Sequence, residues 1–438
     1  MITSPAFNGK RYAILGLARS GLAAAEALLA SGAQITAWDR QDVAREKLEG
    51  RAEIADPLDI DLTGFDGVVV SPGVPLNTHP IAEYAAKFGV PIIGDIELFA
   101  LARDNLPPHK VVGITGTNGK STTTALVDHI LKTAGVPSLM GGNIGIPIME
   151  QDPLPSGGTY VLELSSYQID LTQSLACDVA ILLNVTPDHL DRYSGFEAYA
   201  ASKERLLTMQ DGGWAVVGTD DDTSRVIADR RAVQLLRISG RELPKKLRGL
   251  PLLQGPHNWQ NIAAARSAAG YLGLNEPMIE AAIKTFKGLP HRMEVIREHN
   301  GVLFINDSKA TNQASTAPAL AAFPPAPDAR IHWIVGGLAK EDGLGECADQ
   351  LGNVAAAYTI GEAGPRFEEL LDGKVPVRNC ELLCDATRRA VEAAKPGDII
   401  LLSPACASFD QFRDYERRGE HFRQIVDMLT DHEGDAAA

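Results

Sequence analysis

The chain has 438 residues, a length that corresponds to about three domains, and its 45% hydrophobic content is enough to build sizeable cores. With 41 basic against 56 acidic residues the net charge is -15, which argues against a general nucleic-acid or anionic-membrane surface. Arg19 and Glu26 interrupt the apolar stretch near the N-terminus, and no run approaches the roughly 18 apolar residues of a membrane span. We therefore expect a cytoplasmic protein whose five scattered cysteines are reduced thiols.

The first hundred residues alternate between strand and helix patterns. Apolar strand patterns cover residues 12–17, 33–38 and 67–70, and a helical pattern covers residues 20–31. This alternation predicts a parallel, Rossmann-like sheet.

The run G-L-A-R-S-G at residues 16–21 lies between the first strand and the first helix, which is the layout of a dinucleotide fingerprint. Ala18 stands where the middle glycine would let the backbone approach a pyrophosphate. The layout still suits a diphosphate-containing ligand at the helix N-terminus, with Asp39 or Arg40 near its nucleoside end. The S-P-G turn at residues 71–73 either adds a second contact there or simply ends a strand.

The run G-I-T-G-T-N-G-K-S-T at residues 113–122 follows an apolar strand pattern and precedes a helical one at residues 123–133. In such a loop, glycines let backbone N–H groups converge on phosphate oxygens, Lys120 reaches the terminal phosphates, and Ser121 offers a hydroxyl to Mg2+. Ile114 departs from the longer G-x-x-x-x-G-K-[ST] pattern. The motif predicts a phosphate-binding loop for ATP with magnesium.

Three residues of the middle region are candidates for chemistry beside this loop. Glu163 ends an apolar run in V-L-E-L-S-S-Y-Q, and His189 follows another in N-V-T-P-D-H-L-D-R-Y. An acid and a histidine at the carboxyl ends of parallel strands can ligate Mg2+, although this cation prefers oxygen ligands and a histidine alone is more often structural. Lys203 by itself would ordinarily be a helical lysine facing solvent.

Strand patterns restart after a break at residues 288–290 and cover residues 302–305, 331–335, 357–360 and 398–402, with helices between them. Together with a proline-containing connection at residues 104–109, this predicts three domains: residues 1–95, 96–293 and 294–438.

Taken together, these motifs resemble the Mur ligase family of ATP-dependent enzymes that form amide bonds. The resemblance spans nearly the whole chain. Besides the phosphate loop it rests on G-G-N-I-G (141–145), E-L-S-S-Y-Q (163–168), N-V-T-P-D-H-L-D-R-Y (184–193), H-N-W-Q-N (257–261), L-P-H-R (289–292), N-D-S-K-A-T-N (306–312) and S-P-A-C-A-S-F-D-Q-F (403–412). The last run, with R-R-G after it, points to the D-glutamate-adding members. The resemblance implies an α/β fold with Rossmann-like first and third domains around a central P-loop ATPase-like domain.

The resemblance also assigns roles around ATP. Lys120, His189 and Lys203 would be catalytic, with Lys203 carbamylated, because an anionic oxygen suits magnesium and an ammonium repels it. Two magnesium ions would be held by Ser121, Glu163, His189 and the carbamylated Lys203. The residues expected at ATP are Gly116, Thr117, Asn118, Gly119, Lys120, Ser121, Thr122, Asn261, Arg292 and Asp307.

Two further sets follow from the resemblance. The residues expected along a UDP-muramoyl substrate are Gly16, Arg19, Ser20, Gly21, Asp39, Arg40, Ser71, Gly73, Asn143, Ser165 and Gln168. An amino-acid pocket, where cations and hydroxyls must pair with two carboxylates, would be lined by Lys309, Thr311, Lys340, Ser408 and Phe409. Lys340 lies in G-G-L-A-K, where related enzymes often carry Asp-Gly before the lysine.

The resemblance implies small-molecule substrates, UDP-N-acetylmuramoyl-L-alanine and D-glutamate, joined through an acyl phosphate in peptidoglycan precursor synthesis. We expect a monomer with no nucleic-acid partner. Three alternatives stay open: a folylpolyglutamate synthase-like or other amino-acid ligase, an NAD-dependent oxidoreductase that uses the first domain, and a nucleotide-binding regulatory module without turnover.

Overall fold

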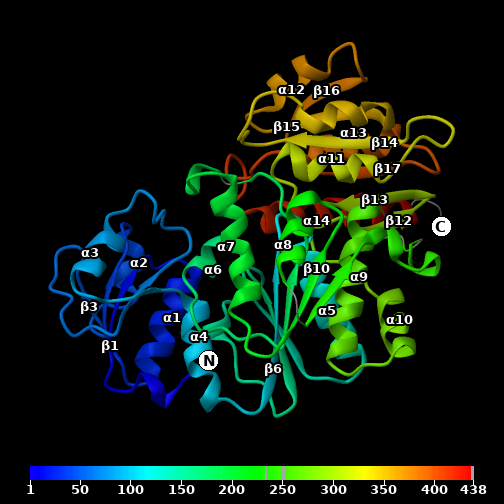
Figure 1. Cartoon of the computed structure of the whole chain (residues 1–438). Coiled ribbons are helices and arrows are strands. Elements are labelled where there is room, and N and C mark those ends of the chain that lie inside the picture. Colours follow the sequence, from blue (N-terminus) through cyan, green and yellow to red (C-terminus); the bar gives the residue numbers. More distant parts are fainter. Residues whose placement is uncertain (189, 232–233, 249, 251–252, 254, 436–438) are drawn as a thin grey trace. The chain divides into compact units, whose positions relative to one another are not determined.

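A computed structural model describes residues 1–188, 190–231, 234–248, 250, 253 and 255–435 (Figure 1). The chain packs as two compact units, Met1–Phe286 and Lys287–Ala438. The first unit contains two sheets and the second contains one. The predicted α/β class with parallel sheets is therefore confirmed, whereas the predicted domain boundaries at residues 95 and 293 stay predictions.

The N-terminal sheet of the first unit is parallel, with the strand order β3-β2-β1-β4-β5. Its strands are β1 (Arg11–Leu15), β2 (Gln34–Trp38), β3 (Glu53–Ile54), β4 (Gly67–Val70) and β5 (Ile92–Ile93). The helices of this part are η1 (Pro5–Phe7), α1 (Arg19–Ala30), α2 (Asp42–Glu46), α3 (Ile81–Lys87), α4 (Asp95–Ala102) and η2 (Arg103–Asn105). Strands β2 and β3 are added on one side of β1, and β4 and β5 on the other, so the strand order reverses between β1 and β4. Ligands of such sheets bind at the carboxyl ends of the strands at that point.

The central sheet is also parallel, with the order β11-β10-β9-β6-β8-β7. Its strands are β6 (His109–Thr115), β7 (Ser138–Gly142), β8 (Gly158–Glu163), β9 (Val179–Leu182), β10 (Trp214–Gly218) and β11 (Leu235–Ile238). Its helices are α5 (Lys120–Thr133), η3 (Ile148–Glu150), α6 (Ser166–Asp170), η4 (Leu190–Arg192), α7 (Phe196–Thr208), α8 (Asp222–Arg230), η5 (Gly240–Glu242), η6 (Lys245–Leu247), α9 (Pro256–Tyr271) and α10 (Glu276–Lys284).

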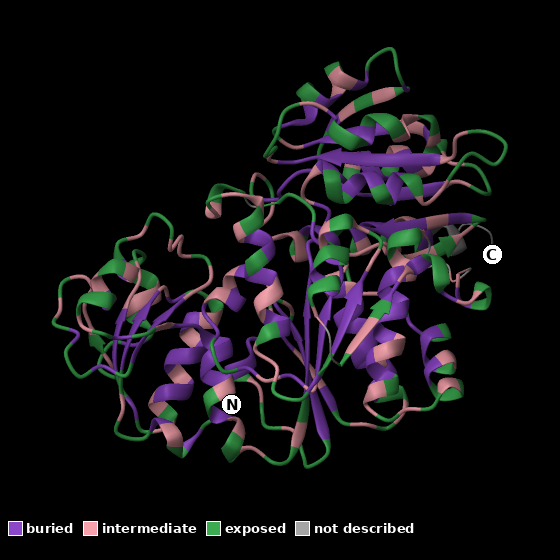
Figure 2. Cartoon of the chain, in the orientation of Figure 1, coloured by how far each residue is buried: buried purple, intermediate pink, exposed green. Residues whose placement is uncertain are grey.

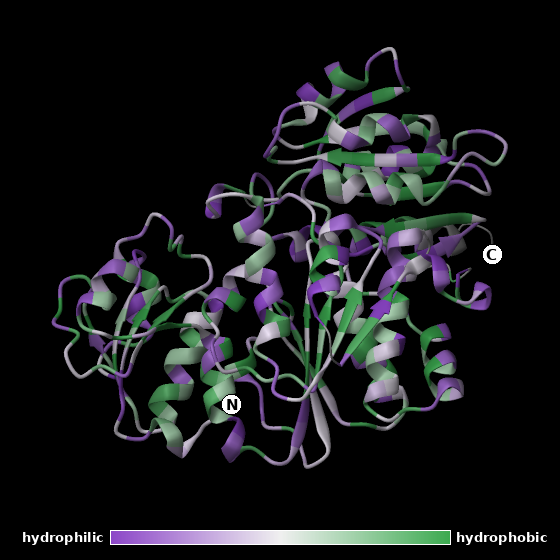
Figure 3. Cartoon of the chain, viewed as in Figure 1, coloured by the Kyte–Doolittle hydropathy of each residue, from purple (hydrophilic) through white to green (hydrophobic). Residues whose placement is uncertain are grey.

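Helices cover both faces of the central sheet. In Figure 1, α5 and α9 pack together on one side of β6, and α6 and α7 pack together on the other. Strands covered on both faces become continuous apolar runs, and every residue of β8 and β9 is buried. Figure 2 shows these strands buried between helices whose outer faces are exposed, and Figure 3 shows the same strands as largely hydrophobic.

One continuous hydrophobic core joins the two sheets of the first unit. Leu28 of α1 and Ile96 and Phe99 of α4 belong to the same buried cluster as Tyr160 of β8. The rings of Phe99 and Tyr160 meet edge to face, with 4.9 Å between their centroids. Because the cluster is shared, the N-terminal and central sheets form a single compact unit.

The second unit has one sheet with the order β12-β13-β17-β14-β15-β16, parallel except for β12. Its strands are β12 (Glu294–His299), β13 (Val302–Asn306), β14 (Ile331–Gly336), β15 (Val354–Ile360), β16 (Val377–Glu381) and β17 (Ile399–Leu402). The helices are α11 (Gln313–Ala321), η7 (Gly345–Asn353), α12 (Gly364–Leu371), α13 (Leu383–Ala393) and α14 (Tyr415–Asp435). Buried residues of α11, η7 and α12 form one core, and those of α13 and α14 form another.

The antiparallel edge strand β12 is absent from the sequence-based expectations. Its hairpin to β13 turns at Asn300 and Gly301, whose φ values are 50° and 75°. An Asn-Gly pair with two positive φ angles is the commonest signal of a two-residue hairpin, so this element could have been predicted.

No helix among the described residues is both long enough and apolar enough to span a membrane.

Candidate functional site

The phosphate loop joins β6 to α5 at the carboxyl edge of the central sheet. Gly116 has φ 152° and Gly119, the N-cap of α5, has φ 84°, and L side chains rarely adopt such backbone conformations. A Cβ on Gly119 would also overlap the amide oxygen of Asn261 on α9. Because Gly119 has no side chain, Asn261 can lie directly beside the loop. The first N–H groups of α5 have no partner within the helix and are directed out of its N-terminus.

Lys120 is the first residue of α5, and its side chain lies over the loop. Its Nζ donates to the carbonyl oxygens of Gly116 and Thr117, each at 2.8 Å. Bonds from an ammonium to charged phosphate oxygens are stronger than bonds to neutral carbonyls. An arriving triphosphate would therefore compete well for this lysine.

Two residues that the sequence analysis did not single out hold the loop in shape. Asn184, just after β9, accepts from the backbone N–H of Asn118 at 2.8 Å and donates to its carbonyl at 3.1 Å. The hydroxyl of Tyr199 on α7 lies 3.1 Å from that of Thr117. An amide side chain directly after a buried strand at this edge was the available signal for Asn184.

Glu163 ends β8, the neighbour of β6, and its side chain is buried. Its Oε1 accepts from Nδ2 of Asn143 at 2.9 Å, whereas its Oε2 is buried without a hydrogen-bond partner among the described residues. A buried carboxylate oxygen without a donor is costly unless a cation or water fills the position. Such an oxygen fits Mg2+, which prefers oxygen ligands.

The predicted metal set is only partly described. His189 lies outside the described residues, and within those residues no three His, Cys, Asp or Glu side chains are grouped to hold a metal ion. Ser121 is buried at the start of α5, and Thr122 is partly exposed beside it.

Lys203 lies on α7 and is only 2% exposed, so the expectation that a lone helical lysine faces solvent is wrong here. Its Nζ donates to the carbonyl of Gly116 at 2.9 Å and lies 4.6 Å from the ring centroid of Tyr199. Burial, and next the positive charge of Lys120, hold the pKa of Lys203 well below its ordinary value. The structure therefore brings a readily deprotonated amine to the phosphate loop.

At the N-terminal sheet, the G-L-A-R-S-G loop is closed by tight packing. Gly16 has φ 89° and lies against Ser71, while a Cβ on Gly21 would overlap the carbonyl of Gly16. Asp39 braces the loop, because its carboxylate accepts from the backbone N–H of Leu17 at 2.6 Å and of Gln41 at 2.9 Å. The structure thus gives Asp39 a role in loop shape that the sequence analysis did not foresee, and its contact with a nucleoside stays a prediction.

Arg19 connects this loop to the central part of the unit. Its Nη2 donates to the carbonyl of Gly145 in the G-G-N-I-G run at 2.7 Å. Of the other predicted substrate residues in this part of the chain, Arg40 and Gly73 are exposed, and Ser20 and Ser71 are partly exposed. Two of the predicted substrate motifs therefore meet within one unit.

Ser165 and Gln168 form a capping box at the start of α6. The Ser165 hydroxyl accepts from the backbone N–H of Gln168, and the Gln168 side chain accepts from the backbone N–H of Ser165, both at 3.2 Å. The side chain of Asn143 is likewise hydrogen-bonded within the protein, to the carboxylate of Glu163. These contacts account for the residues structurally, so their places along a substrate stay predictions.

In the second unit, four of the residues predicted to line an amino-acid pocket follow strands at the carboxyl edge of the sheet. Nζ of Lys340, after β14, lies 3.3 Å from the hydroxyl of Thr311. Nζ of Lys309, after β13, donates to the hydroxyl of Tyr415 at 3.0 Å and lies 4.1 Å from the centroid of its ring. Ser408, after β17, is buried. The sequence analysis missed Tyr415, although an aromatic residue two positions before R-R-G was visible.

The side chain of Phe409 is 69% exposed within this unit, so no wall of the pocket is assigned to it.

Asp307 follows β13 and is buried. Its carboxylate accepts from the hydroxyl of Ser403 at 2.7 Å and from the backbone N–H of Met293 at 3.1 Å. Burial raises the pKa of Asp307 to about 7, although these two bonds and the charge of Arg292 lower it. Asp307 therefore ties β13 to β17, and the contacts of Asp307 and Arg292 with ATP stay predictions.

Comparison with known families identifies this arrangement. The family models "Mur ligase middle domain" and "Mur ligase, glutamate ligase domain" match residues 114–249 and 291–406. A UDP-N-acetylmuramoylalanine–D-glutamate ligase of Novosphingobium aromaticivorans is 62% identical over 436 residues, covering 98% of this chain and 97% of its own. The chain belongs to the Mur ligase family.

Another relative of this Mur ligase is the UDP-N-acetylmuramoylalanine–D-glutamate ligase of Sphingopyxis alaskensis. It is 60% identical, with 98% of this chain and 100% of the relative covered. These names favour none of the three alternatives left open by the sequence, and the chain is an enzyme of the ligase class.

Solved structures share the fold at low sequence identity. The MurF ligase of Thermotoga maritima in complex with ADP has a TM-score of 0.60 at 20% identity, with 96% of each chain covered. The UDP-N-acetylmuramate-alanine ligase of the same organism has a TM-score of 0.59 at 17% identity, with 96% of this chain and 99% of that chain covered.

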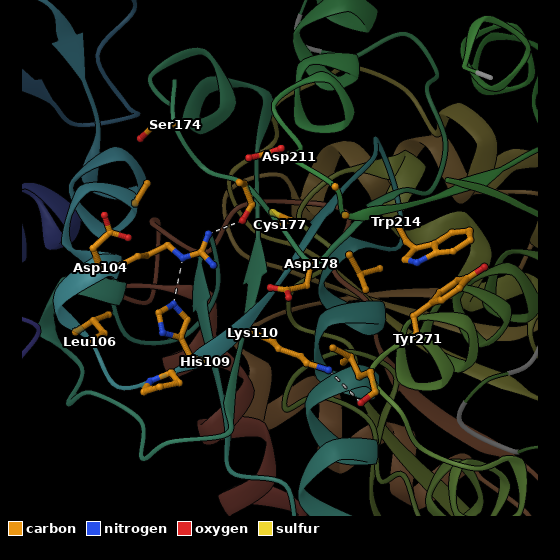
Figure 4. Close-up of a pocket in the computed structure, with 18 of the residues that line it drawn as sticks. Asp104, Leu106, His109, Lys110, Ser174, Cys177, Asp178, Asp211, Trp214 and Tyr271 are labelled. Atoms are coloured by element: carbon orange, nitrogen blue, oxygen red, sulfur yellow. Dashed lines mark hydrogen bonds between the residues drawn. The ribbon is translucent and has the colours of Figure 1, made fainter. Parts of the chain in front are cut away.

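A cavity of about 800 Å³ in the first unit lies away from these groups (Figure 4). It is lined by His109, Val179 and Trp214, which begin β6, β9 and β10, whereas the phosphate loop follows the carboxyl end of β6. Ligands of open parallel sheets bind at the carboxyl ends of the strands, so this cavity is not the active site of the Mur ligase.

Proposed function

We propose that this Mur ligase joins the amino group of D-glutamate to the carboxylate of UDP-N-acetylmuramoyl-L-alanine and converts ATP to ADP and phosphate. The names of relatives 60% and 62% identical support this reaction. The structural observation that supports it is that Lys309, Thr311, Lys340 and Ser408 all follow strands at the same sheet edge, with Nζ of Lys340 3.3 Å from the Thr311 hydroxyl. Two cations and two hydroxyls suit an amino acid with two carboxylates.

In the first step, a carboxylate oxygen of the muramoyl substrate attacks the γ-phosphorus of ATP, and the bond to the ADP oxygen breaks to give an acyl phosphate. The main obstacle is repulsion between two anions. Lys120 and the N–H groups at the start of α5 would reduce it by placing positive charge and dipoles on the phosphates.

Magnesium, when bound, would further offset the phosphate charge. We propose two ions, held by Ser121, Glu163, His189 and Lys203 as a carbamate. The buried, unpartnered Oε2 of Glu163 supports this assignment.

Carbamylation of Lys203 is part of the proposal. The modification requires a neutral amine, whose nitrogen bonds to the carbon of CO2 and loses a proton. Burial against Gly116 and the nearby charge of Lys120 both favour the neutral form of Lys203. The product is an anionic oxygen ligand in place of a buried ammonium.

In the second step, the amine of D-glutamate attacks the acyl carbon, and phosphate leaves through a tetrahedral intermediate. The amino-acid pocket must hold both carboxylates so that only the amine reaches the acyl phosphate. We assign this task to the side chains of Lys309, Thr311, Lys340 and Ser408, which follow strands at one sheet edge.

The nucleotide end of the muramoyl substrate is assigned to the loop at residues 16–21, with the diphosphate at the N-terminus of α1. We further propose that the enzyme acts in the cytoplasm as a monomer.

The decisive experiment measures ADP or phosphate release with Mg-ATP and UDP-N-acetylmuramoyl-L-alanine, comparing D-glutamate with L-glutamate, L-lysine and no amino acid. Turnover that requires D-glutamate is the expected result. Equal turnover with L-lysine, or no turnover with any amino acid while ATP still binds, would contradict the assigned substrate.

A further inference from the structure

Arg418 is among the largest fully buried side chains of the protein, and it is a cation. It lies in the first turns of α14, within the R-R-G run, and is 1% exposed. No carboxylate among the described residues comes within ion-pair distance of it. A buried charge without a counter-ion is unfavourable unless dipoles surround it, so the groups that replace the counter-ion need an explanation.

Those groups are main-chain carbonyls of two loops at the carboxyl edge of the sheet. The Arg418 Nη2 donates to the carbonyl of Ser308 at 2.9 Å and to that of Cys406 at 3.0 Å, and Nη1 donates to that of Ala407 at 3.2 Å. Its Nε donates to the hydroxyl of Ser308 at 3.0 Å. One guanidinium thus holds the loop after β13 and the loop after β17 together.

A third loop, after β14, is joined to the same group. Leu338 and Ala407 exchange two backbone hydrogen bonds, each of 2.9 Å. Gly337 has φ 129°, and a Cβ on it would overlap the carbonyl of Ala407 and crowd Nη1 of Arg418. The close approach of these loops therefore requires glycine at 337 and a flat, forked cation at 418.

These three loops carry the side chains of the proposed amino-acid pocket: Lys309 after β13, Lys340 after β14 and Ser408 after β17. The carbonyl of Ala407 points at Arg418, so the N–H of the same peptide, that of Ser408, points the opposite way. This N–H has no acceptor among the residues that the structure describes. Ala405, in the same loop, has φ 56°, a strained conformation that the surrounding contacts must maintain.

We infer that Arg418 is a positioning residue for the amino-acid pocket: it fixes the three loops so that Lys309, Lys340 and the Ser408 N–H face the carboxylates of the incoming amino acid. It also contributes a positive charge close to the proposed site for an anion, and no carboxylate among the described residues lies within ion-pair distance of it. This inference rests on the proposed function, because that function defines the pocket's ligand.

The test compares Arg418→Lys with a matched control, Arg417→Lys, whose parent side chain is exposed in the same run. Lysine keeps the charge but has a single donor group that cannot bridge two loops. Arg418→Lys should raise KM for D-glutamate about tenfold or more, while KM for ATP and the muramoyl substrate stay within about twofold. Arg417→Lys should change none of them.

An unchanged KM for D-glutamate in folded Arg418→Lys, or an equal rise of all three KM values, would overturn the inference. If Arg418→Lys does not fold, Ser308→Ala takes its place, because it removes the Nε acceptor and leaves the buried charge. An unchanged KM for D-glutamate in Ser308→Ala would then be the overturning result.

Hydrogen exchange separates this inference from the proposed function. In Arg418→Lys, backbone amides at residues 308–311, 337–340 and 405–409 should exchange faster than in the wild type, whatever amino acid the enzyme uses. Unchanged exchange at these amides would contradict the positioning role. A wild-type enzyme that shows no turnover with D-glutamate would contradict only the proposed substrate.

Discussion

The carboxyl edges of the central sheet and of the second-unit sheet differ in how their buried polar side chains are hydrogen-bonded. Eleven buried side-chain N or O atoms lack a hydrogen-bond partner among the described residues, and ten of them lie in the first unit. Four of these belong to Thr115, Thr123, Thr124 and Glu163, around the phosphate loop. At the second-unit edge the side chains of Arg418, Asp307 and Ser403 are instead all hydrogen-bonded, and one buried side-chain atom among the described residues, Oγ1 of Thr359 in β15, lacks a partner.

This difference suggests a division of labour. Unpartnered polar atoms beside the phosphate loop are suited to a ligand that brings its own donors and cations, such as a metal-bound nucleotide. A loop cluster whose side chains are hydrogen-bonded to one another and to the backbone is suited to holding a few side chains at fixed distances from a small ligand. We therefore expect variants at the first edge to lower turnover and variants at the second edge to raise KM for the amino acid.

The largest effect is expected at the phosphate loop. Lys120→Met removes the charge that would lie on the ATP phosphates, and kcat should fall by about a hundredfold to a thousandfold. Lys132→Met is the matched control on the same helix, because its partly exposed pair with Asp128 contributes little. Steady-state ADP release measures both, and similar kcat values for the two variants would contradict the assigned role of the loop.

The next effect concerns Lys203. Lys203→Arg keeps a cation but cannot form the carbamate, so we expect kcat to fall by about a hundredfold. In the wild type, 13C NMR with labelled bicarbonate should show a carbamate signal that disappears in Lys203→Arg and persists in Lys110→Arg. An identical spectrum for wild type and Lys203→Arg would eliminate carbamylation at this residue.

A smaller effect is expected at the second edge. Lys340→Met removes one cation from the amino-acid pocket, and KM for D-glutamate should rise by about tenfold to a hundredfold, since a charge-assisted hydrogen bond is lost. KM for ATP should stay within about twofold. A lower kcat for Lys340→Met with an unchanged KM for D-glutamate would contradict the proposed difference between the two edges.

The smallest effect on activity is expected at Asp95, which sharpens the comparison through stability. Neither carboxylate oxygen of Asp95 has a donor in hydrogen-bond geometry among the described residues, although the N–H groups of Ile96 and Asp95 and the Gln168 amide lie near enough to moderate the effect of burial. Burial raises the pKa of Asp95 from 3.8 to about 6. A raised carboxyl pKa means that the folded state binds more protons than the unfolded state between these values, so stability falls as pH rises through this window.

The variant Asp95→Asn removes this dependence. Between about pH 4.5 and about pH 8, its stability relative to the wild type should increase by about 2 kcal/mol, since each pKa unit corresponds to about 1.4 kcal/mol. Thermal or urea unfolding of both proteins at the two pH values measures the change. A constant difference between the proteins would show that the Asp95 carboxylate has a partner in solution.

The sequence by itself determined the features that depend on neighbours along the chain. Apolar periodicity predicted the strands β1, β2, β4, β6, β8, β9, β13, β14, β15 and β17. Glycine positions added the phosphate loop, because the loop's strand, glycines, lysine and helix are consecutive. The fingerprint at residues 16–21 and the resemblance of the motifs to those of the Mur ligases could also be recognised from the sequence alone. The Asn300-Gly301 pair before β13 carries an equally local signal, that of a two-residue hairpin.

The tertiary structure decided what depends on residues distant in the chain. Lys203 resembles any helical lysine in sequence, and only the packing of α7 against β6 and the loop buries it beside Gly116. Asp39 and the pair Ser165–Gln168 resemble ligand contacts in sequence, yet they also brace local backbone. Arg418 joins loops whose bonded residues are 110 and 12 residues away in the chain, a relation that no local pattern encodes. Side-chain type and spacing predict elements, but burial and hydrogen-bond partners arise only when separate elements pack.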